Sequence, residues 1–141
     1  MNPSTPSLNV LLRSMRPIRN PGIYVYCQLP LDADLTGLPA IATFRESEGL
    51  TVILEENAAL ARGLEPRFRA GWITLTVYSD LESVGLTAVV AGALADRGIS
   101  CNVVAAVDHD HLFVPVAAAS DALDALVLLS KNAISRENAG C

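Results

Sequence analysis

The chain has 141 residues, of which 51% are apolar and 18% are charged, and its net charge is −5. A chain this long and this apolar can bury a core, which predicts a folded globule and excludes a disordered chain. The acidic balance without a basic stripe argues against nucleic-acid binding, and no apolar run approaches the ~20 residues of a membrane span. We expect no secretory signal either, because the N-terminus lacks a basic segment followed by a hydrophobic core.

The three cysteines, Cys27, Cys101 and Cys141, are far apart and form no C-x-x-C pair. An odd count without a spacing pattern favours neither a disulfide framework nor a zinc site, and it fits a reducing compartment. We therefore expect a cytoplasmic protein in which Cys27 and Cys101 are small core residues of strands.

The N-terminal half is predicted to contain two short helices, a strand and a hairpin. Apolar residues recur at helical spacing after Ser7, and proline at position 17 ends that helix. In chain order we expect a helix over 8–15, a turn at 21–22, a strand over 23–29, a loop over 30–39, hairpin strands over 40–46 and 50–54, and a helix over 55–62.

The segment 71–117 has the clearest pattern in the chain. From Trp72 to Tyr78 apolar and polar side chains alternate, which predicts a half-buried strand. Leucine, valine and alanine then recur at helical spacing over 86–94, and Gly98 ends that helix. A strand over 99–107, a tight turn at 108–110, a strand over 111–116 and a helix from Ser120 complete most of a ferredoxin-like βαββαβ unit.

The last helix is followed by no obvious fourth strand, and we expect the polar end of the chain to fray. One solution is that the strand 71–78 extends a sheet shared by both halves, although the sequence does not choose the pairing. Pro115 lies in what is usually a central strand, where proline removes a ladder hydrogen bond, so it is expected where pairing ends.

The turn from Ser79 to Gly85 carries the most suggestive chemistry. A strand that feeds into a helix aims the unpaired N–H groups of the helix at one spot, where they attract an anion. Ser83 is a candidate N-cap, Gly85 allows close approach to the backbone, and Asp80 adds a carboxylate. Such a site suits a zwitterion, although a serine cap and an aspartate turn also explain these residues without any ligand.

Three separated motifs resemble ACT domains over about residues 8–130. They are Ser79-Asp80-Leu81 with the Val84–Ala88 stretch and the following Leu94–Asn102, Glu46-Ser47-Glu48-Gly49 upstream, and Asp108-His109-Asp110-His111 downstream. The chain is similar to small stand-alone tandem ACT proteins related to the CASTOR amino-acid sensors and to aspartate-kinase regulatory domains. The resemblance implies an α/β (α+β) sandwich of two ferredoxin-like units, the first without its first helix, and a non-catalytic allosteric role.

The resemblance also implies where a free amino acid would bind, namely at the turn 79–87 and the seam between the units. Backbone N–H groups of Gly85 and Leu86 would take the carboxylate, and Asp80 with Glu46 or Glu48 would take the ammonium. The candidate ligand-binding residues are Ser79, Asp80, Leu81, Ser83, Val84, Gly85, Leu86, Thr87, Asn102, Glu46, Glu48, Asp108, His109 and Asp110.

We expect an N-terminal unit over 1–65, a C-terminal unit over 66–132 and a loose tail over 133–141. The small face of the helix (Thr87, Ala88, Ala91 and Ala95) suggests a partner surface, so a homodimer is expected. No cofactor is expected. Two alternatives stay open: an interaction module whose turn is empty, and a metal-dependent enzyme at the cluster 108–111.

Overall fold

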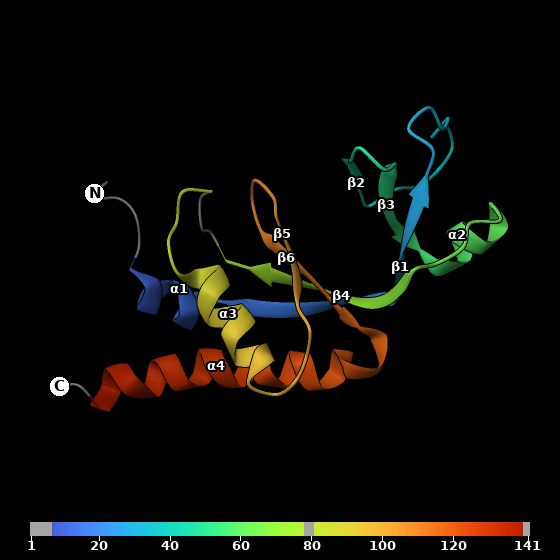
Figure 1. The fold of residues 1–141 in the computed structure, drawn as a ribbon. Helices are drawn as coiled ribbons and strands as arrows, with labels where there is room; N and C mark the ends of the chain where they lie inside the picture. The colour runs from blue at the N-terminus through green and yellow to red at the C-terminus, as the bar shows by residue number, and fades with distance from the viewer. Residues whose placement is uncertain (1–6, 78–80, 140–141) are drawn as a thin grey trace.

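The structure is a computed structural model that describes residues 7–77 and 81–139, with side chains as far as Ala133. The described helices cover one face of a single curled sheet (Figure 1). No described helix is long and apolar enough to cross a bilayer. The elements in chain order are α1 (Leu8–Ser14), β1 (Arg16–Leu29), β2 (Ala42–Arg45), β3 (Leu50–Glu55), α2 (Glu56–Ala61), β4 (Phe68–Thr76), α3 (Leu86–Ala95), β5 (Asn102–Ala105), β6 (Asp110–Pro115), the 3-10 turn η1 (Val116–Ala118) and α4 (Ala119–Ala139).

The two halves of the chain share their central strands reciprocally. The sheet order is β2-β3-β1-β4-β6-β5, and all the neighbouring pairs are antiparallel. The start of β1 pairs with the end of β4, where Arg16 lies opposite Thr76, and it supplies the fourth strand that the C-terminal half lacks. The start of β4 does the same for the N-terminal half, where Phe68 lies opposite Tyr26. Each ferredoxin-like unit is thus completed by the first strand of the other.

The turn expected at Pro21-Gly22 is wrong, because β1 continues through it. The register with β4 shifts between Asn20 and Tyr24, and Gly22 adopts a φ of 98°, so the two residues form a bulge inside one strand. The Tyr24 hydroxyl donates to the Pro21 carbonyl at 2.7 Å and closes this bulge. The prolines are tolerated because this part of β1 pairs with β4 alone and leaves its other edge open.

Two separate cores lie on the helix-covered face of the sheet. The larger one joins the inward side chains of β4 and β6, such as Ile73 and Leu112, to α1, α3 and α4. The smaller one lies under α2, around Val25 and Leu54. The loop 30–41 replaces the missing first helix of the N-terminal unit, and Leu35 and Leu38 cover this smaller core in its place.

The C-terminal tail expected over 133–141 is wrong for the residues that the structure describes. Helix α4 continues to Ala139, and Ala133 is only 4% exposed against the larger core. Residues 140–141 lie outside the description. Strand β5 is shorter than the stretch 99–107, while Pro115 stands at the end of β6 where the proline argument expected it.

Candidate functional site

The strand-to-helix turn follows β4 and leads into α3. Tyr78, Ser79 and Asp80 lie outside the described residues, so the expectations for Ser79 and Asp80 have no structural counterpart here. Gly85 is the N-cap of α3, with a φ of 101° in the left-handed region. The expectation that Ser83 is the N-cap is wrong, because the chain enters the helix through this glycine conformation two residues later.

Gly85, as the N-cap of α3, has no side chain with which to cap the first backbone N–H groups of the helix. The first turn of the helix holds no acidic residue either. Leu86 is 3% exposed and anchors this end of the helix in the core, whereas Thr87 is exposed. Just before it, Leu81 and Val84 are 64% and 88% exposed. The first turn therefore presents donors and a partial positive charge to an anion.

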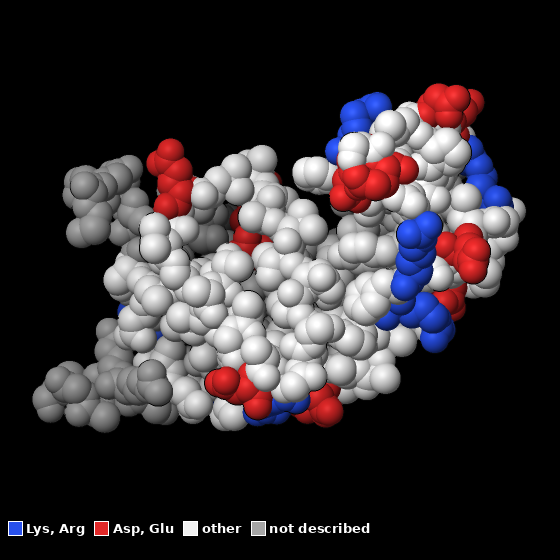
Figure 2. Space-filling view, viewed as in Figure 1, with Lys and Arg blue, Asp and Glu red and all other residues white. Residues whose placement is uncertain are grey.

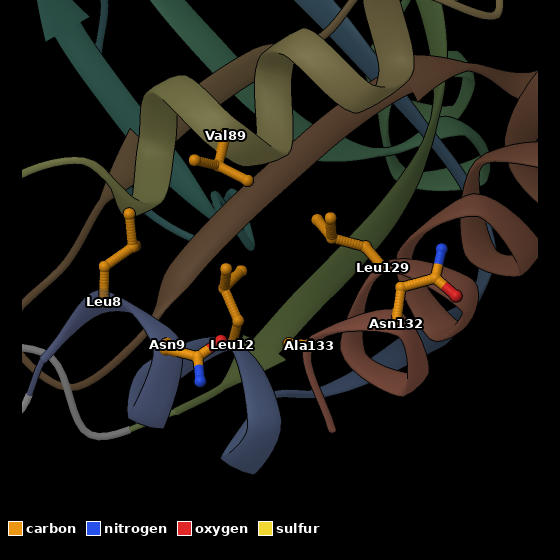
Figure 3. A pocket seen from close by; sticks show the side chains of 7 residues that line it. All are labelled: Leu8, Asn9, Leu12, Val89, Leu129, Asn132 and Ala133. Carbon is orange, nitrogen blue, oxygen red and sulfur yellow. The ribbon is translucent and has the colours of Figure 1, made fainter. Parts of the chain in front are cut away.

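Leu8 of α1 lies directly against this N-terminus. A Cβ added to Gly85 would come within 3.2 Å of the Leu8 Cδ2 atom, so the glycine allows the two helices to approach each other. Beyond Leu8 the three helices α1, α3 and α4 line an open pocket of about 380 Å³, called here the helix cavity. Figure 3 shows Val89, Leu12 and Leu129 directed into it from three different helices. Its lining residues are Leu8, Asn9, Leu12, Val89, Leu129, Asn132 and Ala133.

The β5–β6 turn lies at the same end of the sheet as the strand-to-helix turn. Asp110 is opposite Leu75, one residue before the end of β4, and the Ala106 N–H donates to the His109 carbonyl at 3.0 Å. Asp110 is only 8% exposed, and burial raises the pKa of its carboxyl, opposed by the nearby His111 and His109. That Asp108, His109 and Asp110 bind the ligand stays a prediction.

Two family profiles of the ACT domain match the chain, one over residues 3–71 and the other over residues 67–127. A crystal structure from Vibrio cholerae, titled as a protein of unknown function and a possible transport protein, is 48% identical. It superposes with a TM-score of 0.79 over 87% of this chain and 95% of that chain. The chain belongs to the ACT-domain family. The two profile matches overlap at residues 67–71, where β4 begins and the two ACT units share a strand.

Less similar structures share the tandem ACT fold alone. The ligand-free regulatory subunit of aspartate kinase from Thermus thermophilus has 9% identity and a TM-score of 0.60 over 80% of this chain and 95% of that one. A protein from Agrobacterium tumefaciens has 16% identity and a TM-score of 0.64 over 82% and 89%. The comparison with curated proteins found no match. The resemblance inferred from the motifs and the fold class are confirmed.

Glu46 and Glu48 lie far from the strand-to-helix turn. The expectation that one of them helps Asp80 to bind the ammonium group of the ligand is therefore wrong within one chain. Both lie in the β2–β3 turn, which follows the pair Leu29–Leu50, whereas the strand-to-helix turn follows the opposite end of β4. The whole of β1 lies between the two turns, and its length along the strand is about 40 Å at the usual rise per residue. Glu46 instead accepts a hydrogen bond from the Thr51 hydroxyl at 2.7 Å, and the Ser47 hydroxyl donates to Glu48.

Asn102 is also placed away from the turn. It lies in register with Phe113 and, through β6, with Trp72, four residues before the end of β4. Its side-chain amide donates to the Phe113 carbonyl at 3.2 Å, which gives it a structural bond. Among the described residues, no group of three or more His, Cys, Asp and Glu is arranged to hold a metal ion, so the cluster 108–111 has no metal-ligand set there.

Sequence reasoning missed the contribution of α1 and α4 to this ACT site. Helical spacing predicted α1 correctly, but it carried no information about the element on which α1 docks. Leu8 and Asn9 reach the site because β1 pairs with β4 and brings α1 beside the start of α3. The only available signal was the helix at the head of the chain, which an ordinary βαββαβ unit does not need.

Proposed function

We propose that this tandem ACT protein is a non-catalytic regulatory module that binds a free amino acid at the N-terminus of α3. The observation that supports this most directly is the first turn of α3, which begins at a glycine N-cap without a capping side chain of its own and lies beside Leu8 and the helix cavity. A helix of ten residues carries a useful partial positive charge at this end. Neither Glu46 nor Glu48 takes part in the proposed site.

The proposed ligand uses both parts of this site. Its carboxylate accepts hydrogen bonds from the N–H groups of Leu86 and Thr87, and the Asp80 carboxylate binds its ammonium group. An aliphatic side chain enters the helix cavity past Leu8, because leucine and valine side chains dominate the lining. The amides of Asn9 and Asn132 at the sides of the cavity hydrogen-bond a polar end if the side chain has one.

Binding at this position would act on both units. Leu8 belongs to α1, which leads directly into β1, and β1 pairs with strands of both halves. A ligand that moves Leu8 away from Gly85 therefore favours one arrangement of α1 against α3, and such differential binding is what a regulatory signal requires. The described cysteines are free thiols, which supports placing this function in the reducing cytoplasm.

A thermal-unfolding screen against the twenty amino acids tests the proposal. A ligand present at about 100 times its dissociation constant stabilises the native state by about 2.7 kcal/mol. For a domain of this size that raises the midpoint by about 8 °C. A shift produced by one or a few aliphatic amino acids supports the proposal. No shift with any of them refutes it and leaves the interaction module with an empty turn as the better description.

Substitutions locate the effect. Asp80→Ala is expected to abolish the ligand-induced shift, and Gly85→Ala to reduce it, since a Cβ there meets Leu8 and strains a φ of 101°. Gly98→Ala is the matched control: its φ is 72°, yet nothing lies within 4 Å of the added Cβ. Each variant is compared with its own ligand-free midpoint. Equal shifts in wild type, Asp80→Ala and Gly85→Ala place the ligand elsewhere and contradict the site.

We also propose that two copies pair through α3. The helix contains no charged residue, and Thr87, Ala88 and Ala95 are exposed on its outer side. Figure 2 shows a largely uncharged surface over this helix, whereas charged side chains gather on the lobe that carries β2 and α2. Small residues permit close helix packing. Light scattering is expected to give twice the chain mass, and an Ala88→Glu variant to give the mass of one chain; a single-chain mass for wild type at high concentration refutes the dimer.

A further inference from the structure

The other face of the sheet carries no described helix, yet several of its side chains are buried. The even-numbered residues of β4 point to this face, together with Phe113 and His111 of β6 and Tyr26 of β1. Phe113 is 1% exposed and Ala70 is fully buried. The curl of the sheet brings its two outer parts over these residues and covers them without a helix.

Aromatic rings form a continuous floor on this face. The rings of Trp72 and Phe113 stack with centroids 6.0 Å apart and an angle of 18° between their planes. Tyr26 meets Phe113 edge-on at 5.7 Å, and Tyr24 meets Trp72 edge-on at 5.1 Å. These contacts fix the ring planes, so the floor is rigid.

A groove of about 410 Å³ lies over this floor, called here the sheet groove. One wall comes from residues 40–42 at the start of β2, and the other comes from β5 and the residue that follows it. In Figure 2 the surface is hollowed between the lobe that carries β2 and the β5–β6 hairpin. The volume is in the range of small-molecule sites. The lining residues are Ala40, Ile41, Ala42, Trp72, Val104, Ala106, His111 and Phe113.

His111 is the polar group of this groove, and its neighbours fix its proton. The Trp72 indole N–H, which is only a donor, donates to His111 Nδ1 at 3.0 Å. The Asn20 amide donates to the Thr74 hydroxyl oxygen at 2.9 Å, which turns the hydroxyl hydrogen toward the same Nδ1 at 3.2 Å. With two donors aimed at it, Nδ1 holds a lone pair, so the proton of the neutral ring is on Nε2.

The Nε2–H group is consequently a donor of fixed orientation. In the described part of the chain it has no hydrogen-bond partner, while its ring lines the sheet groove. Every other lining side chain is aliphatic or aromatic. A single oriented donor in an uncharged aromatic groove selects aromatic ligands that carry an acceptor.

We propose that the sheet groove is a second ligand site, which binds a small, flat, uncharged aromatic molecule that carries a hydrogen-bond acceptor. The ring of the ligand lies against Trp72 and Phe113, and its acceptor receives the His111 Nε2–H. The site is on the opposite face of the sheet from α3, so it stands or fails independently of the amino-acid site.

Benzamide is the probe, and toluene is its control of similar shape without an acceptor. Trp72 is the single tryptophan of the chain, so its indole N–H gives one peak in a ¹H–¹⁵N spectrum of the full chain. Titration with benzamide is expected to move this peak to saturation. Benzamide should bind about five times more tightly than toluene, the effect of one hydrogen bond between neutral groups.

Two variants and a control test the geometry. Ala42→Phe fills the groove from the β2 wall and should abolish the benzamide shift, while Thr43→Phe, one residue on and exposed, should leave it intact. His111→Phe keeps the ring and removes the donor, so the tighter binding of benzamide relative to toluene should be lost. The amino-acid response at α3 should persist in Ala42→Phe.

Several outcomes overturn the proposal. The first is a Trp72 indole peak that benzamide leaves unmoved in wild type. The second is equal affinity of wild type for benzamide and toluene. The third is binding of benzamide to Ala42→Phe that is as tight as to wild type. A fourth is a dimer in solution that Ala42→Phe breaks, because a second copy of the chain then occupies the groove. If His111→Phe fails to fold, the Ala42→Phe and Thr43→Phe pair still decides.

Discussion

The contact between Gly71 of β4 and Ala119 of α4 gives a sharp test of how the helix layer is held on the sheet. A Cβ built on Gly71 would lie 2.6 Å from the Ala119 Cβ, below the 3.0 Å limit that real Cβ atoms respect. Gly71 has no positive φ, so its backbone suits alanine and the clash is the only penalty. Ala119 is fully buried at the start of α4.

The expected size follows from overpacking. Inserting a methyl group into a packed core costs about 1–3 kcal/mol. Gly71→Ala is therefore expected to lower the unfolding midpoint by about 3–9 °C. Ala119→Gly removes the opposing methyl group, at a cost of about 0.5–1 kcal/mol for a helix residue. Combining the two substitutions exchanges the methyl group across the interface, so the double variant is expected to be close to wild type.

Urea unfolding followed by far-ultraviolet circular dichroism gives the four free energies of this double-mutant cycle. The coupling energy is expected to be about 1–3 kcal/mol in favour of the double variant. A Gly71→Ala protein as stable as wild type would refute the reasoning about the interface. So would a double variant whose loss equals the sum of the two single losses, because the methyl groups would then not meet.

Three further predictions test burial and charge. Burial lowers the pKa of His111 below its usual value of 6.5; the positive charge of His109 lowers it further and the negative charge of Asp110 opposes the shift. The folded state therefore favours the neutral ring, and this contribution to stability is present above pH 6.5 and lost as the pH falls through the lower folded pKa. Urea midpoints should drop more steeply below pH 6.5 in wild type than in His111→Phe, and identical pH profiles would contradict this. Leu126→Ala should lower the free energy of unfolding, measured in urea, by about 2–5 kcal/mol because Leu126 is fully buried. Leu128→Ala, at a site 46% exposed, should lower it by less than about 1 kcal/mol. Equal losses would contradict the packing of the Leu126 face of α4 against the core. Burial raises the pKa of the Cys27 thiol, which is 3% exposed. In a variant with both Cys101→Ser and Cys141→Ser, Cys27 is the single thiol, and Ellman's reagent should modify it only as fast as the protein opens; rapid reaction in native buffer is the contrary result.

Local patterns predicted the elements well where one face is buried. The alternation from Trp72 onward and the helical spacing after Leu86 both matched β4 and α3, because burial imposes those periods on the sequence. The bulge at Pro21-Gly22 escaped prediction because it depends on pairing with β4, far along the chain.

The candidate site was predicted only in part, for a related physical reason. Spacing located a strand-to-helix turn, but the identity of the cap depended on the backbone angle of Gly85 rather than on the side chain of Ser83. Strand register decides which loops meet, and it placed Asp110 near the turn and Glu46 at the far end. The hydrogen bonds that orient His111 come from two other strands, so no local motif could announce them.

The reciprocal exchange of first strands bears on how the chain folds. Arg16 must find Thr76 before the C-terminal sheet is complete, and Phe68 must find Tyr26 before the N-terminal one is. Pairings between such distant segments slow folding, because a long loop has to close first. During synthesis on the ribosome, β1 and β3 emerge with an unpaired edge until β4 arrives, so the newly made N-terminal half waits in a state open to aggregation. Once complete, neither half can open alone, and we expect the whole chain to unfold in a single transition.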